Sequence, residues 1–245
     1  MRRRLPVAGL PAPLAGRTLL QVSDLHIGRR VSDAYVARVF ERAAALAPDL
    51  VAYTGDFVSW YPPAFDKMRR LFEHAPRGTL GTVGILGNHD YWRNWSHPEI
   101  ADQVAAIASA YGVRMLRNES CEIAGLQFAG LDDLWAGRFD PARALAGIDP
   151  ARACVALSHN PDTADLEGWG AHRGWILAGH THGGQVRLPF LPPPFLPVRN
   201  RRYAMGECAC PQGRRMYVSR GVGHLTPVRF NVRPEITLFT LVPAG

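Results

Sequence analysis

Five short apolar segments in this sequence each run directly into polar residues that can bind a metal ion or a phosphate group. The segments with their polar ends cover residues 18–24, 50–56, 82–90, 154–160 and 174–184. Short apolar runs bounded by turn residues are typical of buried β-strands. The polar residues just beyond the apolar positions are Asp24, Asp56, Asn88, His159 and His180. Because ligands of α/β proteins bind in the loops at strand ends, we expect these side chains to line one site.

Helical patterns alternate with these strands. Residues 32–49 carry apolar side chains at helical spacing, with Ser32 as the expected N-cap and Pro48 as the stop. Further helices are predicted near 63–74, after a capping box formed by Ser96 and Glu99, and from Asp140-Pro141 onward. The alternation of strands and helices indicates a layered α/β fold.

The remaining segments also have readable patterns. Residues 113–131 predict a short strand and then a hairpin that turns at Gly125, and strands are expected at 215–219 and 235–242. Residues 1–16 are interpreted as a lead-in strand and loop, and residues 186–200 as a proline-rich apolar loop. With no internal repeat and no linker, we expect a single domain over 1–245.

Composition excludes several classes of protein. Hydrophobic residues make up 47% of the 245 residues, charged residues 20%, and the mean hydropathy is -0.10, values typical of an ordered, soluble chain. The apolar runs are too short to span a bilayer, and four cysteines are too few for a disulfide scaffold. Prolines at 6, 11 and 13 interrupt the basic N-terminus, so a cytoplasmic location is expected rather than export.

The net charge of +7 is concentrated near the C-terminus. Residues 199–233 contain eight arginines and a single acidic residue, Glu207. An arginine-rich surface suits a nucleotide, a nucleic acid or an anionic membrane face, because guanidinium groups pair with phosphate. A general arginine bias of the genome would explain the composition equally well. Since no nucleic-acid-binding module is evident, no specific nucleic acid is expected as a partner.

Histidines gather at the same strand ends. Five of the nine lie there: His26, His89, His159, His180 and His182. Together with the carboxylates they form a donor set that suits divalent Mn, Zn, Fe or Co, while the lack of clustered cysteines argues against a structural zinc site. In Asp24-x-His26 and His180-x-His182, alternate residues project the same way, so each pair places two ligands on one extended turn.

In sequence order these blocks read D-x-H, GD, GNHD, H and GH-x-H, and the set resembles the calcineurin-like metallophosphoesterase superfamily. The segments 179–189, 219–223 and 229–241 are similar to its YkuE-like bacterial branch. The resemblance implies a β-sandwich flanked by helices and two divalent metal ions. Asp24, His26 and His182 would bind the first ion, Asn88, His159 and His180 the second, and Asp56 both.

The same resemblance implies a phosphodiesterase or pyrophosphatase reaction. A metal-bridging hydroxide would attack phosphorus in line, and His89, oriented by Asp90, would protonate the leaving group. Ser59 departs from the family, which often has Asp or Asn at that position, and this leaves the metal preference open. Arg29 and Arg93 are candidates for binding the substrate phosphate, with ordinary surface arginines as the alternative.

The expected substrate is a small phosphodiester or pyrophosphate. Aromatic side chains follow the second and third blocks (Trp60, Tyr61, Trp92, Trp95), and Leu188, Phe190, Leu191, Phe195 and Leu196 lie in the proline-rich loop. If exposed, they favour an amphipathic, lipid-linked substrate, such as the UDP-acylglucosamine-type precursor that some relatives in the superfamily split, and peripheral contact with a membrane. The alternatives are a phosphomonoesterase or phosphoprotein phosphatase, and a non-catalytic metal-binding scaffold.

Overall fold

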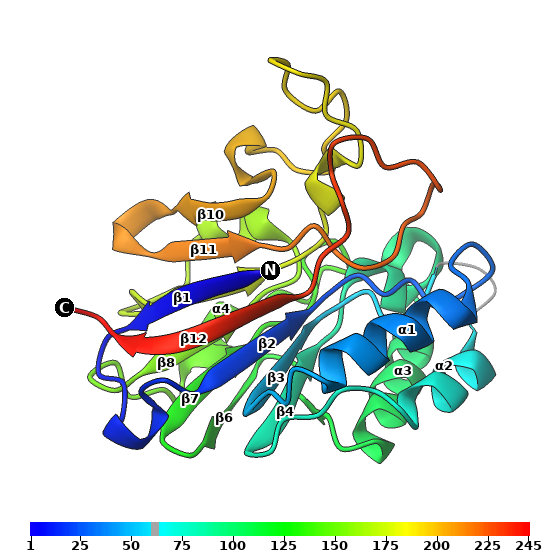
Figure 1. Ribbon diagram of the computed structural model, residues 1–245. Helices are drawn as coiled ribbons and strands as arrows, with labels where there is room; N and C mark the ends of the chain where they lie inside the picture. Colours follow the sequence, from blue (N-terminus) through cyan, green and yellow to red (C-terminus); the bar gives the residue numbers. More distant parts are fainter. Residues whose placement is uncertain (60–63) are drawn as a thin grey trace.

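Two mixed β-sheets form the centre of the structure, a computed structural model that describes residues 1–59 and 64–245 (Figure 1). In those residues each sheet has six strands. The first sheet has the order β1 (Arg2–Val7), β12 (Thr237–Pro243), β2 (Thr18–Val22), β3 (Leu50–Thr54), β4 (Gly81–Ile85) and β5 (Arg114–Met115). The second has the order β10 (Gly206–Ala209), β11 (Arg215–Val218), β9 (Trp175–Ala178), β8 (Cys154–Leu157), β7 (Leu126–Gly130) and β6 (Glu119–Ile123).

Successive side chains of a strand serve different layers of the core. Leu19 of β2 points into the space between the two sheets, where it shares a buried cluster with Phe128 of β7. Its neighbour Leu20 faces the other way and packs in a cluster with Phe40 and Phe72 from the helices. Since strand side chains alternate between faces, a strand that is apolar throughout is covered on both sides. The predicted layered fold with a β-sandwich is therefore confirmed.

Within residues 1–59 and 64–245, four α-helices cover the outer faces of the sheets. They are α1 (Asp33–Ala44), α2 (Phe65–Phe72), α3 (Pro98–Ala110) and α4 (Pro141–Leu145). The first three lie along the outer face of the first sheet, as Figure 1 shows, and α4 packs on the second sheet through Ala144. Ser32 caps α1 as predicted, because its side chain accepts a hydrogen bond from the Tyr35 amide. The predicted helix near 63–74 is found as α2, with residue 63 outside the described part of the chain.

The predicted capping box before α3 is wrong. Pro98 occupies the first turn of α3, and the N-cap position falls on His97. Ser96 lies one residue too early and donates its hydroxyl to the Arg93 carbonyl instead. Because the φ angle of proline is already helical and its missing N–H is not needed in the first turn, the helix begins at the proline rather than at the serine.

The two ends of the chain form neighbouring strands in the first sheet. The N-terminal segment forms β1 as predicted and pairs in parallel with β12, which itself lies between β1 and β2 (Figure 1). Strands β2, β3 and β4 run parallel to one another, as do β8 and β9 in the second sheet. The carboxyl ends of these five strands carry the loops in which the predicted metal ligands occur.

Candidate metal centre

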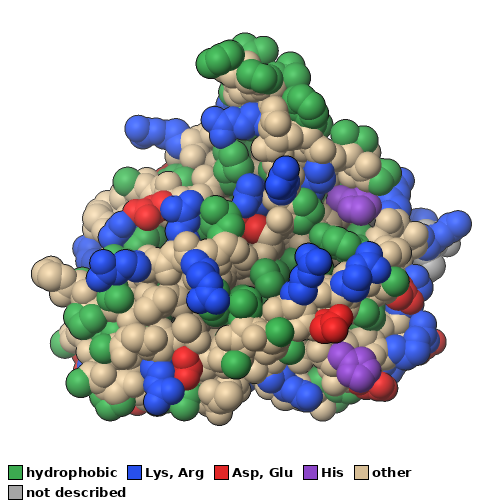
Figure 2. All heavy atoms as spheres, in the orientation of Figure 1, with side chains coloured by type: hydrophobic (Ala, Val, Ile, Leu, Met, Phe, Trp, Pro, Cys, Tyr) green, Lys and Arg blue, Asp and Glu red, His purple; other side chains and the backbone are tan. Residues whose placement is uncertain are grey.

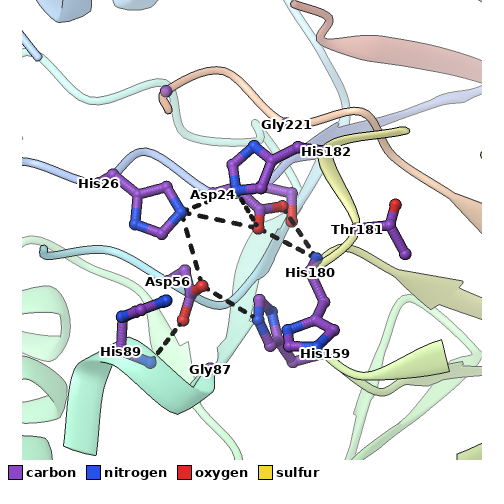
Figure 3. Close-up of polar contacts among 12 residues, drawn as sticks. Asp24, His26, Asp56, Gly87, His89, His159, His180, Thr181, His182 and Gly221 are labelled. Atoms are coloured by element: carbon purple, nitrogen blue, oxygen red, sulfur yellow. Dashed lines mark hydrogen bonds and ion pairs between the residues drawn. The ribbon is translucent and has the colours of Figure 1, made fainter. Parts of the chain in front are cut away.

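The seven predicted ligands lie at the carboxyl ends of strands from both sheets. Figure 3 shows six of them, all except Asn88, pointing toward one another. Asp24 and His26 follow β2, Asp56 follows β3, Asn88 follows β4, His159 follows β8, and His180 and His182 follow β9. Six of them form two groups whose ligand atoms lie within 4.8 Å of one another. Each of the six is buried.

The first group consists of Asp24, His26 and His182. The Nε2 atoms of His26 and His182 are 2.9 Å apart, and Asp24 Oδ1 lies 3.5 Å from His182 Nε2. Burial lowers the pKa of His26 to about 3 and that of His182 well below its ordinary value, so both rings are neutral at pH 7. Two neutral imidazoles and a carboxylate that aim at one point form a donor set suited to a divalent cation.

The second group consists of Asp56, His159 and His180, and Asn88 completes it. Asn88 Oδ1 is 2.9 Å from His180 Nδ1, and His159 Nε2 is 3.2 Å from Asp56 Oδ2. Among the described residues, Asn88 Nδ2 and His159 Nε2 have no hydrogen-bond partner although both are buried. Buried polar atoms of native proteins are normally satisfied. A neutral His159 ring can offer its Nε2 lone pair to a cation, whereas Asn88 would bind one through Oδ1, because its Nδ2 is only a donor.

Asp56 lies between the two groups. Its Oδ2 is 3.2 Å from His159 Nε2 on one side and 3.6 Å from His26 Nε2 on the other (Figure 3). The other oxygen, Oδ1, accepts a hydrogen bond of 2.9 Å from the backbone amide of His89. A carboxylate in this position can bind two cations at once and offset their mutual repulsion.

Burial and charge act in opposite directions in the second group. Burial alone would lower the pKa of His159, but the carboxylates of Asp56, Asp24 and Asp133 together outweigh it and raise the pKa to about 10. Burial would raise the pKa of Asp56, but the neighbouring histidine rings hold it well below its ordinary value. Burial also raises the pKa of Asp24 to about 6. Without a cation, the site therefore retains a proton on His159 to balance its carboxylates.

The backbone at the site is strained. Five of the ligand residues have positive φ angles: Asp24 (54°), His26 (48°), Asp56 (56°), His180 (73°) and His182 (49°). Residues with side chains adopt this conformation rarely, and clusters of such residues mark functional sites. Gly221, with φ of 70°, packs against the first of these loops, because an added Cβ would come within 2.7 Å of Asp24 Cβ.

Asp90 holds the backbone of the site together. Its carboxylate accepts hydrogen bonds from the amides of Asp56 (3.0 Å), Gly87 (2.9 Å) and Val58 (3.1 Å). Both of its oxygens are therefore occupied by the loops after β3 and β4. No hydrogen bond among those of the described residues joins Asp90 to the His89 imidazole, so the orientation of His89 by Asp90 stays a prediction.

His89 and Ser59 lie next to the ligands. The His89 ring meets the His26 ring edge-on, with centroids 5.1 Å apart, and within the described residues its buried Nδ1 has no hydrogen-bond partner. Ser59 donates its hydroxyl to the backbone carbonyl of His26 at 2.7 Å. The residue at which this chain departs from its family thus supports a ligand-bearing loop without itself facing the second group.

Arg29 and Arg93 are exposed residues of loops next to the site. The Arg93 guanidinium lies 5.2 Å from the centre of the Trp92 ring. Their binding of a substrate phosphate stays a prediction.

Two residues next to the ligands were missed in the sequence. The Arg229 guanidinium lies 3.0 Å from His182 Nδ1 and donates hydrogen bonds to the backbone carbonyls of His182 and Arg220. The Trp135 ring meets the His180 ring edge-on at 4.4 Å. Both come from loops without a local motif, so only the cluster of arginines near the C-terminus could have pointed to Arg229.

The fold and the site together define a class of protein: an α/β sandwich that presents two groups of metal ligands with a shared carboxylate. The sequence profile described as calcineurin-like phosphoesterase matches residues 17–184. The chain belongs to this family of metallophosphoesterases.

Individual relatives extend the similarity over nearly the whole chain. The phosphodiesterase YaeI of Escherichia coli is 33% identical, over 91% of this chain and 82% of the relative. The metallophosphoesterase YkuE of Bacillus subtilis is 31% identical, over 95% and 81%. The UDP-2,3-diacylglucosamine pyrophosphatase LpxG of Chlamydia muridarum is 27% identical, over 93% and 84%.

A solved structure shares the fold at low sequence identity. The dimetal phosphatase from Danio rerio superposes with a TM-score of 0.51 and 11% identity, covering 89% of this chain and 94% of that one. Within residues 1–59 and 64–245, no helix combines the length and the apolar character needed to cross a bilayer.

Proposed function

We propose that this protein is a dinuclear metal-dependent phosphodiesterase or pyrophosphatase. The observation that supports it most strongly is the position of Asp56, 3.2 Å from a ligand atom of one group and 3.6 Å from a ligand atom of the other. A scaffold that had lost catalysis would not need to retain both groups. The relatives named as a phosphodiesterase and a pyrophosphatase support the same reaction class.

In this proposal Asp24, His26 and His182 hold one divalent ion and Asn88, His159 and His180 the other, with Asp56 shared. The bound ions supply charge stabilisation at the phosphoryl oxygens and activate water at neutral pH. Mn, Zn, Fe and Co all suit this set of oxygen and nitrogen donors.

The residues around the ligands have separate roles. His89 has a buried and unpaired Nδ1 next to the first group, so we assign it the transfer of a proton to the leaving oxygen. Asp90 positions the Asp56 and Asn88 loops through its three backbone hydrogen bonds. Arg29 and Arg93 are proposed to bind the substrate phosphate from the exposed side of the site.

We propose a lipid-linked phosphodiester or pyrophosphate as the substrate, with the reaction at the cytoplasmic face of a membrane. The support is the apolar, proline-rich loop beside the site and the relative LpxG, which is named for a diacylated nucleotide sugar. Trp92 and Trp95 are half-buried beside the third block, whereas Trp60 and Tyr61 lie outside the described residues. Leu196 does not contribute to an apolar rim, because only 7% of it is exposed.

Hydrolysis by the metal-reconstituted protein tests the proposal. We expect faster hydrolysis of bis-p-nitrophenyl phosphate than of p-nitrophenyl phosphate, and cleavage of a nucleoside-diphosphate lipid at the pyrophosphate. Asp56→Asn should lose activity, whereas the matched Asp66→Asn change on an exposed turn of α2 should not. A strong preference for the monoester would favour the alternative, a phosphomonoesterase or phosphoprotein phosphatase. An inactive protein that still binds both ions would favour the scaffold alternative.

A further inference from the structure

Exposed apolar side chains gather on one protrusion of the molecule, formed by residues 186–200 and 224–233 and here called the apolar crest (Figure 1). Of the nine exposed large hydrophobic residues in the described part of the chain, six lie on it. They are Phe190 (106% exposed), Phe195 (70%), Leu191 (56%), Val228 (52%), Phe230 (49%) and Leu188 (46%). Figure 2 shows hydrophobic side chains at the tip of this protrusion and basic side chains below it.

The two segments of the apolar crest are joined to each other. The amide of Arg187 donates to the Phe230 carbonyl at 2.9 Å, and the amide of Phe230 donates to the Gln185 carbonyl at 2.9 Å. Pro193 packs against Gly184, where an added Cβ would come within 2.5 Å of the Pro193 side chain. Hydrogen bonds between the two segments and the packing of Pro193 therefore hold the exposed apolar residues of the crest in place.

Both segments of the apolar crest contact metal ligands. His180 Nε2 lies 2.9 Å from the carbonyl of Pro197, at the end of the first segment. Arg229, in the second segment, contacts His182 through its guanidinium. A surface that engages the apolar crest would thus lie next to the residues that contact His180 and His182.

The two segments of the apolar crest contain basic residues and no acidic residue, although Asp162 and Asp165 contact Asn200 at its base. Between Glu167 and Glu235 the sequence holds one acidic residue, Glu207, which forms an ion pair with Arg215. Arg187 and Arg199 lie in the first segment and Arg202 follows it, and all three are exposed. The exposed apolar residues suit the acyl chains of a bilayer, and the arginines next to them suit its anionic headgroups, which lie closer to the water.

We propose that the apolar crest docks the protein on an anionic bilayer, with Phe190 and its apolar neighbours inserted and the arginines at the headgroups. This identifies the partner surface for the lipid-linked reaction proposed above and rests on that function. Docking holds the metal centre next to the headgroup layer, so a lipid-linked phosphate reaches it while the acyl chains stay in the bilayer.

Vesicle sedimentation of the metal-free protein tests the docking separately from catalysis. We expect binding to phosphatidylcholine vesicles that contain phosphatidylglycerol, and much weaker binding to phosphatidylcholine alone or at high salt. Phe190→Ser should weaken binding by about tenfold or more, since a buried Phe contributes roughly that factor. The matched change Leu80→Ser, at an exposed apolar residue (41%) before β4, should leave binding unchanged.

A second pair of variants tests whether the arginines of the apolar crest contribute to membrane binding. Arg199→Gln should weaken binding to the anionic vesicles by about fivefold, whereas Arg38→Gln on α1 should have little effect. Hydrolysis of soluble bis-p-nitrophenyl phosphate should be unchanged in all four variants. The docking proposal is overturned if the wild type ignores anionic vesicles or if Leu80→Ser weakens binding as much as Phe190→Ser. It is also overturned if the wild-type protein forms a concentration-dependent dimer that Phe190→Ser abolishes, and the wild type does not bind vesicles. The apolar crest would then be an interface between two copies of the chain. None of these results would bear on hydrolysis of the soluble diester.

Discussion

Replacing His89 by Asn should affect the reaction according to how much the leaving group needs a proton. The backbone amide of His89 donates to Asp56 Oδ1 at 2.9 Å, and this bond remains in the variant because it does not involve the side chain. Asp56 therefore keeps its position and both ions should still bind. What is lost is proton transfer from the imidazole, which contributes roughly 10²–10⁴ in rate, or about 3–5 kcal/mol of transition-state stabilisation.

The assay compares kcat/KM for a series of diesters with increasingly poor leaving groups. His89→Asn should lose the full factor on alkyl diesters and little on nitrophenyl diesters, whose leaving groups depart without a proton. Burial lowers the pKa of His89 below its ordinary value of 6.5, so in the wild type kcat/KM for alkyl diesters should fall as the pH rises above that lowered pKa. In the His89→Asn variant, kcat/KM for alkyl diesters should not show this decrease with rising pH.

His74→Asn provides the control, because His74 is an exposed histidine beyond α2. The role of His89 as the acid would be refuted if His89→Asn lost the same factor on every diester, or if it remained fully active on alkyl diesters. Loss of bound metal in the variant would instead mean that the side chain supports the ions.

Three further predictions concern the surroundings of the site. Gly221→Ala places a side chain at φ of 70° and a Cβ 2.7 Å from Asp24 Cβ, so urea unfolding should show a loss of about 2–4 kcal/mol and metal titration a weaker affinity. Burial lowers the pKa of His172 from 6.5 to about 4, so the imidazole contributes stability above pH 6.5 that is lost as the pH falls towards 4, by up to about 3 kcal/mol. His172→Gln should remove that slope, and an unchanged slope would contradict the assignment. Arg229→Met leaves the carbonyls of His182 and Arg220 without their donor and should lower the free energy of unfolding by about 1–3 kcal/mol, measured in urea; unaltered stability would show that these bonds contribute nothing.

The ligands could be predicted because each follows a short buried strand whose pattern is local. A run such as residues 50–54 is buried on both faces and is followed by Gly55 and Asp56, so the strand end is visible in the sequence itself. Parallel strands bring their carboxyl ends to one edge, and this places residues separated by more than a hundred positions in one site.

The remaining features depend on contacts that no local pattern encodes. Gly221 reaches Asp24 and Arg229 reaches His182 only because the chain returns through β12 to the first sheet. The role of Asp90 depends on three backbone amides, and the amide of any residue could occupy those positions. Leu196 resembles its exposed apolar neighbours in sequence but is covered in the fold.

Counting the metal ions tests the central claim most directly. After reconstitution and dialysis, elemental analysis should give two divalent ions per wild-type chain, and anomalous diffraction should place one at each ligand group. Asp56→Asn should lose metal from both groups, because its carboxylate is the one that both share. A single ion per chain, or two ions that Asp56→Asn leaves in place, would contradict the shared-carboxylate centre.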